Sequence, residues 1–117
     1  MNDQLTKDMY DAFPALYRGH TKSPQESAMC WGFQCGDSWY SILYDLSAAL
    51  QEYALLHPEL HLEVMQVKSK FGRLRIHLNE HTCDIDEMIS HACQQAEGID
   101  EDQGMSKKAA VRFPTSF

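Results

Sequence analysis

A cluster of four cations contains the residues whose types and spacing most directly suggest chemistry. The cluster consists of Lys68, Lys70, Arg73 and Arg75, within eight residues of a chain whose formal net charge is −7. Lysine and arginine bind anions, and the arginine guanidinium matches the geometry of phosphate oxygens. Three roles are open for the cluster: binding of an anion or a nucleic-acid backbone, contact with a protein, or local ion pairing on a solvated face. The candidate partners for local pairing are Glu63, Asp45 and Glu52.

The chain also has four cysteines that could bind a metal ion, Cys30, Cys35, Cys83 and Cys93. The spacing of the first two is within the range of a zinc-binding pair, whereas the last two are too far apart for a usual second pair. His81 and His91 could complete a set of four ligands. The more ordinary interpretation is that the cysteines are small buried apolar side chains. We therefore expect no cofactor and keep zinc as the alternative.

A catalytic role for Cys35 is a further candidate. The thiol precedes Gly36 and Asp37 at the start of a predicted helix, where the helix dipole would lower its pKa. A nucleophilic cysteine also needs a base and an orienting group, and no signature of such a set surrounds Cys35. Phosphate-loop, dinucleotide-binding and HExxH patterns are absent from the sequence. The sequence thus favours a binding protein over an enzyme.

Composition limits the kind of molecule that carries these residues. The length of 117 residues fits one domain, and 44% hydrophobic residues are typical of a globular chain. Seventeen acidic residues against ten basic ones disfavour non-specific nucleic-acid binding by the whole molecule and favour a basic partner. No apolar run is long enough to span a membrane and the N-terminus lacks a secretory pattern, so we expect a cytoplasmic protein with reduced thiols.

The cations belong to a predicted β-hairpin at about residues 60–79. Leu74, Ile76 and Leu78 alternate with polar residues, which is the period of a half-buried strand. Phe71 and Gly72 supply the turn, because glycine accepts the positive φ that a tight reversal needs.

Helices must cover the apolar face of this hairpin. Helical spacing of apolar residues predicts helices at about 5–17, 38–56 and 84–97, the first ending near Ala12 ahead of Pro14. Asp37 is the expected N-cap of the second helix, and Asp84 with Glu87 resembles a capping box for the third, which ends at Gly98. We predict one α+β domain over residues 1–98, with a tail over 99–117 and a third strand from either 28–35 or the tail.

Three motifs resemble those of an uncharacterised group of small phage and bacterial proteins. The motifs are FPALYRG, MCWGFQCGDSW and QVKSKFGRLRIHL, and the resemblance extends over about residues 9–97. It implies an origin in phage or mobile-element cargo and implies no particular activity. Members of the group often end in a CxxCG pair that would complete a zinc site, and this chain has no cysteine after Gly98. Ser38 and Ser69 also stand where the group usually has glycine and glutamate.

The favoured hypothesis is a stoichiometric protein binder or inhibitor that occupies a basic partner surface. An anti-defence protein such as an anti-CRISPR, or an immunity protein against a toxin, would act in this way. The acidic residues expected at that contact are Asp45, Glu52, Glu59, Asp84, Asp86 and Glu87. The alternative is a nucleic-acid-binding accessory protein that uses the basic hairpin, and a small metal-binding domain is a third hypothesis. A homodimer through the edges of the sheet also stays open.

Overall fold

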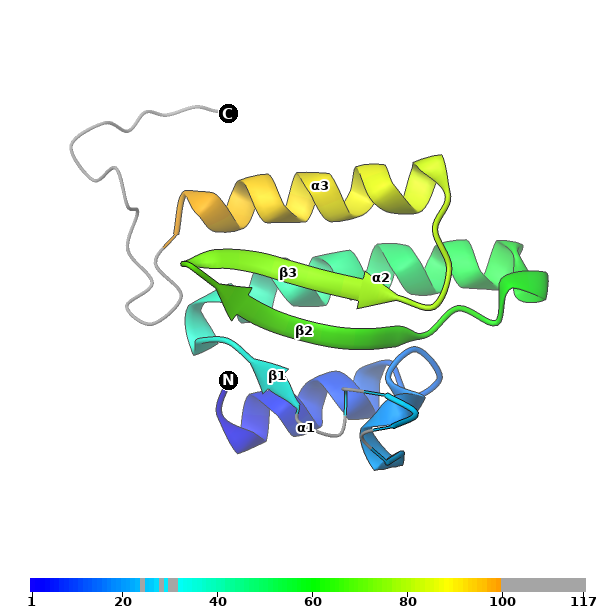
Figure 1. Ribbon diagram of the computed structural model, residues 1–117, viewed down its shortest axis with the longest axis horizontal. Helices are drawn as coiled ribbons and strands as arrows, with labels where there is room; N and C mark the ends of the chain where they lie inside the picture. The colour runs from blue at the N-terminus through cyan, green and yellow to red at the C-terminus, as the bar shows by residue number, and fades with distance from the viewer. Residues whose placement is uncertain (24, 28, 30–31, 100–117) are drawn as a thin grey trace.

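The computed structural model describes residues 1–23, 25–27, 29 and 32–99, in which helices pack against a small sheet (Figure 1). The helices are α1 (Asp3–Ala12), α2 (Tyr40–Leu56) and α3 (Cys83–Glu97), and the strands are β1 (Phe33–Gln34), β2 (Val64–Lys70) and β3 (Arg73–Leu78). The 3-10 helices are η1 (Arg18–Thr21), η3 (Asp37–Trp39) and η4 (Pro58–Leu60). The predicted α+β class is confirmed.

The sheet has the strand order β1-β2-β3. Strands β2 and β3 form the predicted antiparallel hairpin, and β1 comes from the 28–35 segment, one of the two predicted sources. Strand β1 runs parallel to β2, with Phe33 opposite Val67. Parallel neighbours need a crossover connection, which here contains α2.

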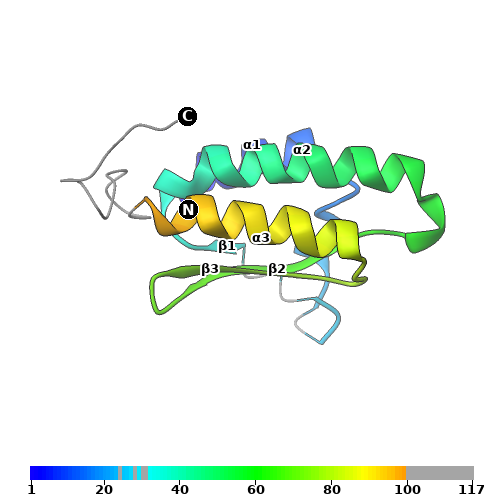
Figure 2. The ribbon, with the colours of Figure 1, turned by 90° about the horizontal axis from the view of Figure 1, so that it is seen from above.

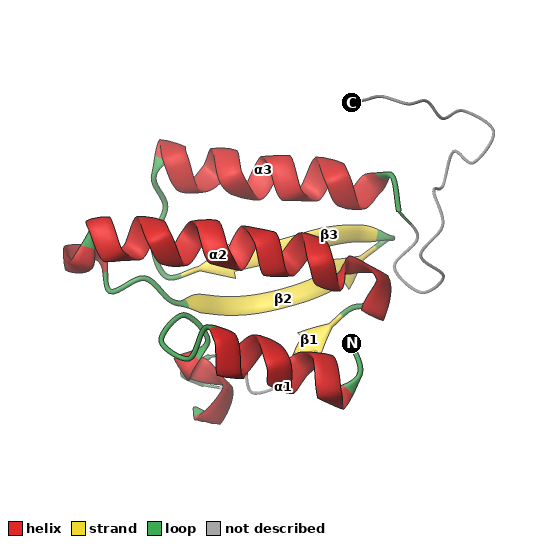
Figure 3. Cartoon of the chain, turned by 180° about the vertical axis from the view of Figure 1, so that it is seen from behind, coloured by secondary structure: helices red, strands yellow, loops and turns green. Residues whose placement is uncertain are grey.

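Helices α2 and α3 cover one face of the sheet. Figure 2 shows both helices on the same side of the strands, and Figure 3 shows them side by side in front of the hairpin. The core between the layers includes Trp39, Leu43 and Leu50 from the second helical segment and Val67 and Leu74 from the hairpin, all buried. The helical spacing seen in the sequence therefore marks the side chains that cover the sheet.

The helix boundaries differ from the prediction at their starts. The second helix opens with the 3-10 turn η3, and Asp37 does not cap it, because its carboxylate accepts hydrogen bonds from the backbone and side chain of Asn2 at 2.6 and 3.0 Å. For α3 the capping residue is Thr82, whose hydroxyl accepts from the Ile85 amide at 3.1 Å, in place of the predicted Asp84. Helix α1 begins at Asp3 and ends at Ala12, which confirms the end predicted ahead of Pro14, whereas the broader helical range of 5–17 was too long.

A buried carboxylate joins the segment after α1 to the start of β2. Glu63 is only 6% exposed, and its Oε2 atom lies 3.0 Å from the Lys22 ammonium. The guanidinium of Arg18 lies 3.4 Å from the other oxygen of Glu63 and also donates to the carbonyls of His61 and Leu62, at 2.6 and 2.9 Å. These bonds fix the chain where it enters the hairpin.

The predicted tail over 99–117 lies outside the described residues except for Ile99. The indole of Trp39 donates to the Ile99 carbonyl at 3.0 Å, so the chain directly after α3 still contacts the core.

Candidate functional site

The register of the hairpin gathers the four cations on one face. Lys68 lies directly opposite Arg75, and Lys70 lies directly opposite Arg73. The apolar side chains that alternate with polar residues along β3, Leu74 and two others, are buried against the helices. Because alternate side chains of a strand point to opposite faces, the cations project from the face that α2 and α3 leave open. We call Lys68, Lys70, Arg73 and Arg75 the basic hairpin face.

An irregularity in the pairing of β2 with β3 keeps the outward-facing residues of the two strands on the same face of the sheet. The pairing shifts between Val64 and Gln66, so that Val64 and Val67, three positions apart, are both buried. Past the shift, the strict alternation of β2 matches that of β3. The bulge therefore sets which residues of β2 face outward.

The basic hairpin face is not neutralised within the described part of the chain. None of its four side chains takes part in an ion pair there. The predicted pairing with Glu63 is wrong, because Arg18 and Lys22 hold that carboxylate. The other predicted partners, Asp45 and Glu52, belong to α2, and this helix covers the opposite face of the sheet (Figure 2). Like charges directly opposite each other in a sheet are destabilising, so this face carries electrostatic repulsion that an anion would relieve.

The turn at the end of the hairpin carries an exposed aromatic ring. Phe71 and Gly72 both have positive φ, of 56° and 75°, as in a type I′ turn. The Phe71 side chain is 91% exposed, and the Lys70 ammonium lies 5.9 Å from the centre of its ring. The positive φ was predicted for Gly72 and not for Phe71. The two-residue loop length was the available signal, because a type I′ turn needs positive φ at both positions.

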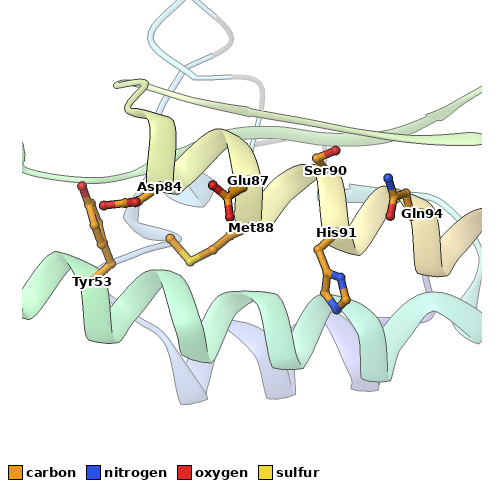
Figure 4. Close-up of a pocket in the computed structure, with 7 residues that line it drawn as sticks. All are labelled: Tyr53, Asp84, Glu87, Met88, Ser90, His91 and Gln94. Atoms are coloured by element: carbon orange, nitrogen blue, oxygen red, sulfur yellow. The ribbon is translucent and has the colours of Figure 1, made fainter. Parts of the chain in front are cut away.

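Three of the six predicted acidic residues line a groove between α2 and α3. Asp84 and Glu87 border one part of it together with Tyr53, and Asp45 borders the adjoining part. The two parts share Met88 and His91. In Figure 4, Tyr53 rises from α2 toward Asp84, while Met88 and His91 point from α3 toward α2. We call this feature the acidic groove.

The other three predicted acidic residues do not line this groove. Glu52 is exposed on α2. Glu59 lies in η4, with its carboxylate 3.6 Å from the ring of His57, and Asp86 lies 3.2 Å from the ring of His81. The predicted set of six is therefore divided between the groove and the surface around it.

The cysteines do not form a metal site in the described residues. Cys35 is buried, Cys83 is exposed at the start of α3, and the half-buried Cys93 thiol donates to the Leu74 carbonyl at 3.3 Å. Burial raises the pKa of the Cys93 thiol, which keeps it protonated. Cys30, the remaining predicted ligand, lies outside the described residues. Across the described ranges, no group of three or more histidine, cysteine or acidic side chains is arranged to hold a metal ion.

Among the described residues, no helix has both the length and the apolar character that crossing a bilayer requires. Comparison of the chain with family models, with curated proteins and with solved structures finds no match in any of the three.

Proposed function

We propose that this protein is a nucleic-acid-binding accessory protein that holds the phosphate backbone of its ligand on the basic hairpin face. The observation that carries the proposal is the register of β2 and β3, which sets Lys68 opposite Arg75 and Lys70 opposite Arg73. The four cations take part in no ion pair within the described residues, which leaves them available to a polyanion.

The overall charge of −7 does not prevent such binding. At physiological ionic strength, exposed charges are screened over about 8 Å. The acidic groove lies between α2 and α3. Both helices lie on one side of the sheet (Figure 2), whereas the cations project from the other face. A phosphate at the hairpin is therefore affected mainly by the four cations, while the acidic body restricts binding to this one surface.

Salt dependence gives a quantitative test. Each phosphate of a single strand that a cation neutralises adds about −0.7 to the slope of log K against log salt concentration, so four contacts give about −3. The measurement is the fluorescence anisotropy of a labelled oligothymidine between about 50 and 200 mM salt. For Arg75→Gln we expect weaker binding and a slope smaller by about 0.7.

The matched control for this test is Lys7→Gln. Lys7 is an exposed cation on α1 that pairs with Asp11 at 2.7 Å, and it lies outside the hairpin. Its replacement removes the same charge, so it should leave the slope unchanged. Equal losses for the two variants, or no binding by the unaltered protein, would refute the proposal.

The acidic groove supports a second candidate function, binding of a basic protein. The groove is bordered by three carboxylates, those of Asp45, Asp84 and Glu87, and also by the apolar Met88 and the ring of Tyr53. It therefore offers a partner both negative charge and apolar contact area. An inhibitor of a host defence complex or an immunity protein against a toxin would use such a surface, and the resemblance to mobile-element proteins favours that role. Complementary charge also speeds association between proteins.

The six predicted acidic residues provide a matched experiment for this second candidate. One variant reverses the three groove charges, and the other reverses those of Glu52, Glu59 and Asp86, so both change the net charge equally. Tagged protein is purified at low and high salt, and the proteins retained are identified. If a basic partner is lost only with the groove variant, the result supports binding at the acidic groove. If both variants lose the partner equally, net charge alone explains the interaction.

A further inference from the structure

Phe71 occupies its position at a conformational cost and without burial in return. Its φ of 56° lies in the left-handed region, which asparagine and glycine adopt far more readily than a bulky aromatic residue. The side chain is 91% exposed, so it adds nothing to the core. Neither turn preference nor packing accounts for a phenylalanine here.

The surroundings of Phe71 indicate what its ring contacts. The ring lies at the end of the basic hairpin face, directly between Lys70 and the turn glycine that precedes Arg73. Successive cross-strand pairs on one face are about 7 Å apart along the strands. That spacing resembles the step between neighbouring phosphates of an extended single strand. A strand lying along the cations would bring one of its bases to the tip of the hairpin.

We infer that Phe71 stacks on an unpaired base, so that the ligand of the hairpin is single-stranded nucleic acid rather than a duplex. This inference rests on the proposed function and adds the class of ligand to it. Aromatic side chains bind single strands in this way because every base has a flat face, and stacking needs no particular sequence. In a duplex the bases are already stacked on one another, so the ring finds no partner there.

The test compares three labelled ligands of about 12 units, a length within the usual range of single-strand sites. They are oligothymidine, an abasic strand with the same phosphates, and a duplex. The unaltered protein should bind oligothymidine about 5- to 150-fold more tightly than the abasic strand, which is the usual contribution of one stacked base. Phe71→Asn should bind the two single strands equally, and Phe71→Trp should keep the preference. Since asparagine suits the left-handed turn, Phe71→Asn retains the hairpin.

Each outcome separates the inference from the proposed function. If Phe71→Asn lowers the affinity for oligothymidine and leaves that for the abasic strand unchanged, the result supports stacking. Leu55→Asn, which alters an exposed apolar residue at the end of α2, is the control. An unchanged preference in Phe71→Asn overturns stacking, as does an equal loss with the abasic strand. In both cases the proposed function stands if Arg75→Gln still weakens binding. Absence of binding to all three ligands by the unaltered protein refutes both.

Discussion

Lys68 lies directly opposite Arg75 across the β2–β3 hairpin, on the face of the sheet that the helices leave open. A pair of this kind lowers stability, because two cations in adjacent strands repel each other without a screening carboxylate. Sheets ordinarily place opposite charges or apolar pairs at such positions. The stability of the fold does not account for this arrangement, whereas the proposed binding of an anion to the hairpin does.

Reversing one charge of this pair should raise stability while it lowers nucleic-acid binding. Arg75→Glu converts a repulsive cross-strand pair into an attractive one, and we expect the free energy of unfolding to increase by about 0.2–1 kcal/mol. Urea unfolding measures this change, with an unchanged m-value as the sign that the two states are otherwise the same. Lys7→Glu is the control, because it breaks the ion pair with Asp11 and should be slightly destabilising. A loss of stability in Arg75→Glu would contradict the repulsion argument.

At the turn, too, a replacement that weakens the proposed binding should stabilise the fold. Phe71→Asn places a residue that tolerates positive φ at a position with φ of 56°, so the free energy of unfolding should rise by about 1 kcal/mol. Gly72→Ala should have the opposite effect, because alanine is strained at a φ of 75°. Thermal unfolding of both variants compares the two positions directly. Destabilisation by Phe71→Asn would contradict the argument from backbone strain and would show that contacts of the ring, such as the one with the Lys70 ammonium, stabilise the turn.

The periodic parts of the fold could be predicted from the sequence. In β3, Leu74 and Ile76 alternate with Arg73 and Arg75 because one face of the strand meets the helices and the other meets solvent. Burial of one face imposes the period, so the period reveals the face. The exposure of the two arginines, and hence their place in the candidate site, followed from the same pattern.

Contacts between distant segments could not be predicted in this way. Glu63 is held by Arg18 and Lys22, and Asp37 is bonded to Asn2, although both acidic residues appeared to have local roles in the sequence. Strand β1 is only two residues long and pairs with β2 in parallel, which leaves no periodic signal. Such pairings depend on how the elements meet in space, and propensity and spacing carry no information about them.

A buried hydrogen bond should make Ser47 important for stability. The Ser47 hydroxyl donates to the Leu43 carbonyl at 2.7 Å, so its oxygen must accept the proton of the buried Tyr17 hydroxyl, 2.5 Å away. Ser47→Ala leaves that hydroxyl without a partner and should cost about 1–3 kcal/mol. Adding Tyr17→Phe to this variant should recover part of the loss. Urea unfolding of the two single variants and the double variant measures the coupling, and strictly additive changes would argue against the bond.

Because of the same tyrosine, the free energy of unfolding should depend on pH in the alkaline range. Burial raises the pKa of Tyr17 well above its usual value near 10, because the phenolate would lose its hydration. In the unfolded chain the hydroxyl ionises at about pH 10, so the stabilisation is complete below that pH and declines as pH rises above it. Between about pH 8 and 11 the loss should be about 1.4 kcal/mol. The measurement is the difference in unfolding free energy between these two pH values, which should be smaller by that amount in Tyr17→Phe.

Space around Gly19 gives a stability test with an internal control. A Cβ atom at Gly19 would lie 2.5 Å from the Ser27 hydroxyl and 2.8 Å from the Glu63 carboxylate, so Gly19→Ala must displace the groups that hold the start of β2. Overpacking of this kind costs about 1–3 kcal/mol.

At Gly98 the nearest atom to an added Cβ is the Gln95 carbonyl oxygen at 3.6 Å, and the φ of −82° suits alanine. Gly98→Ala should therefore be neutral or slightly stabilising. Thermal unfolding of the two variants decides between them, because equal effects would show that the Arg18–Glu63–Lys22 contacts accommodate the added carbon at no cost.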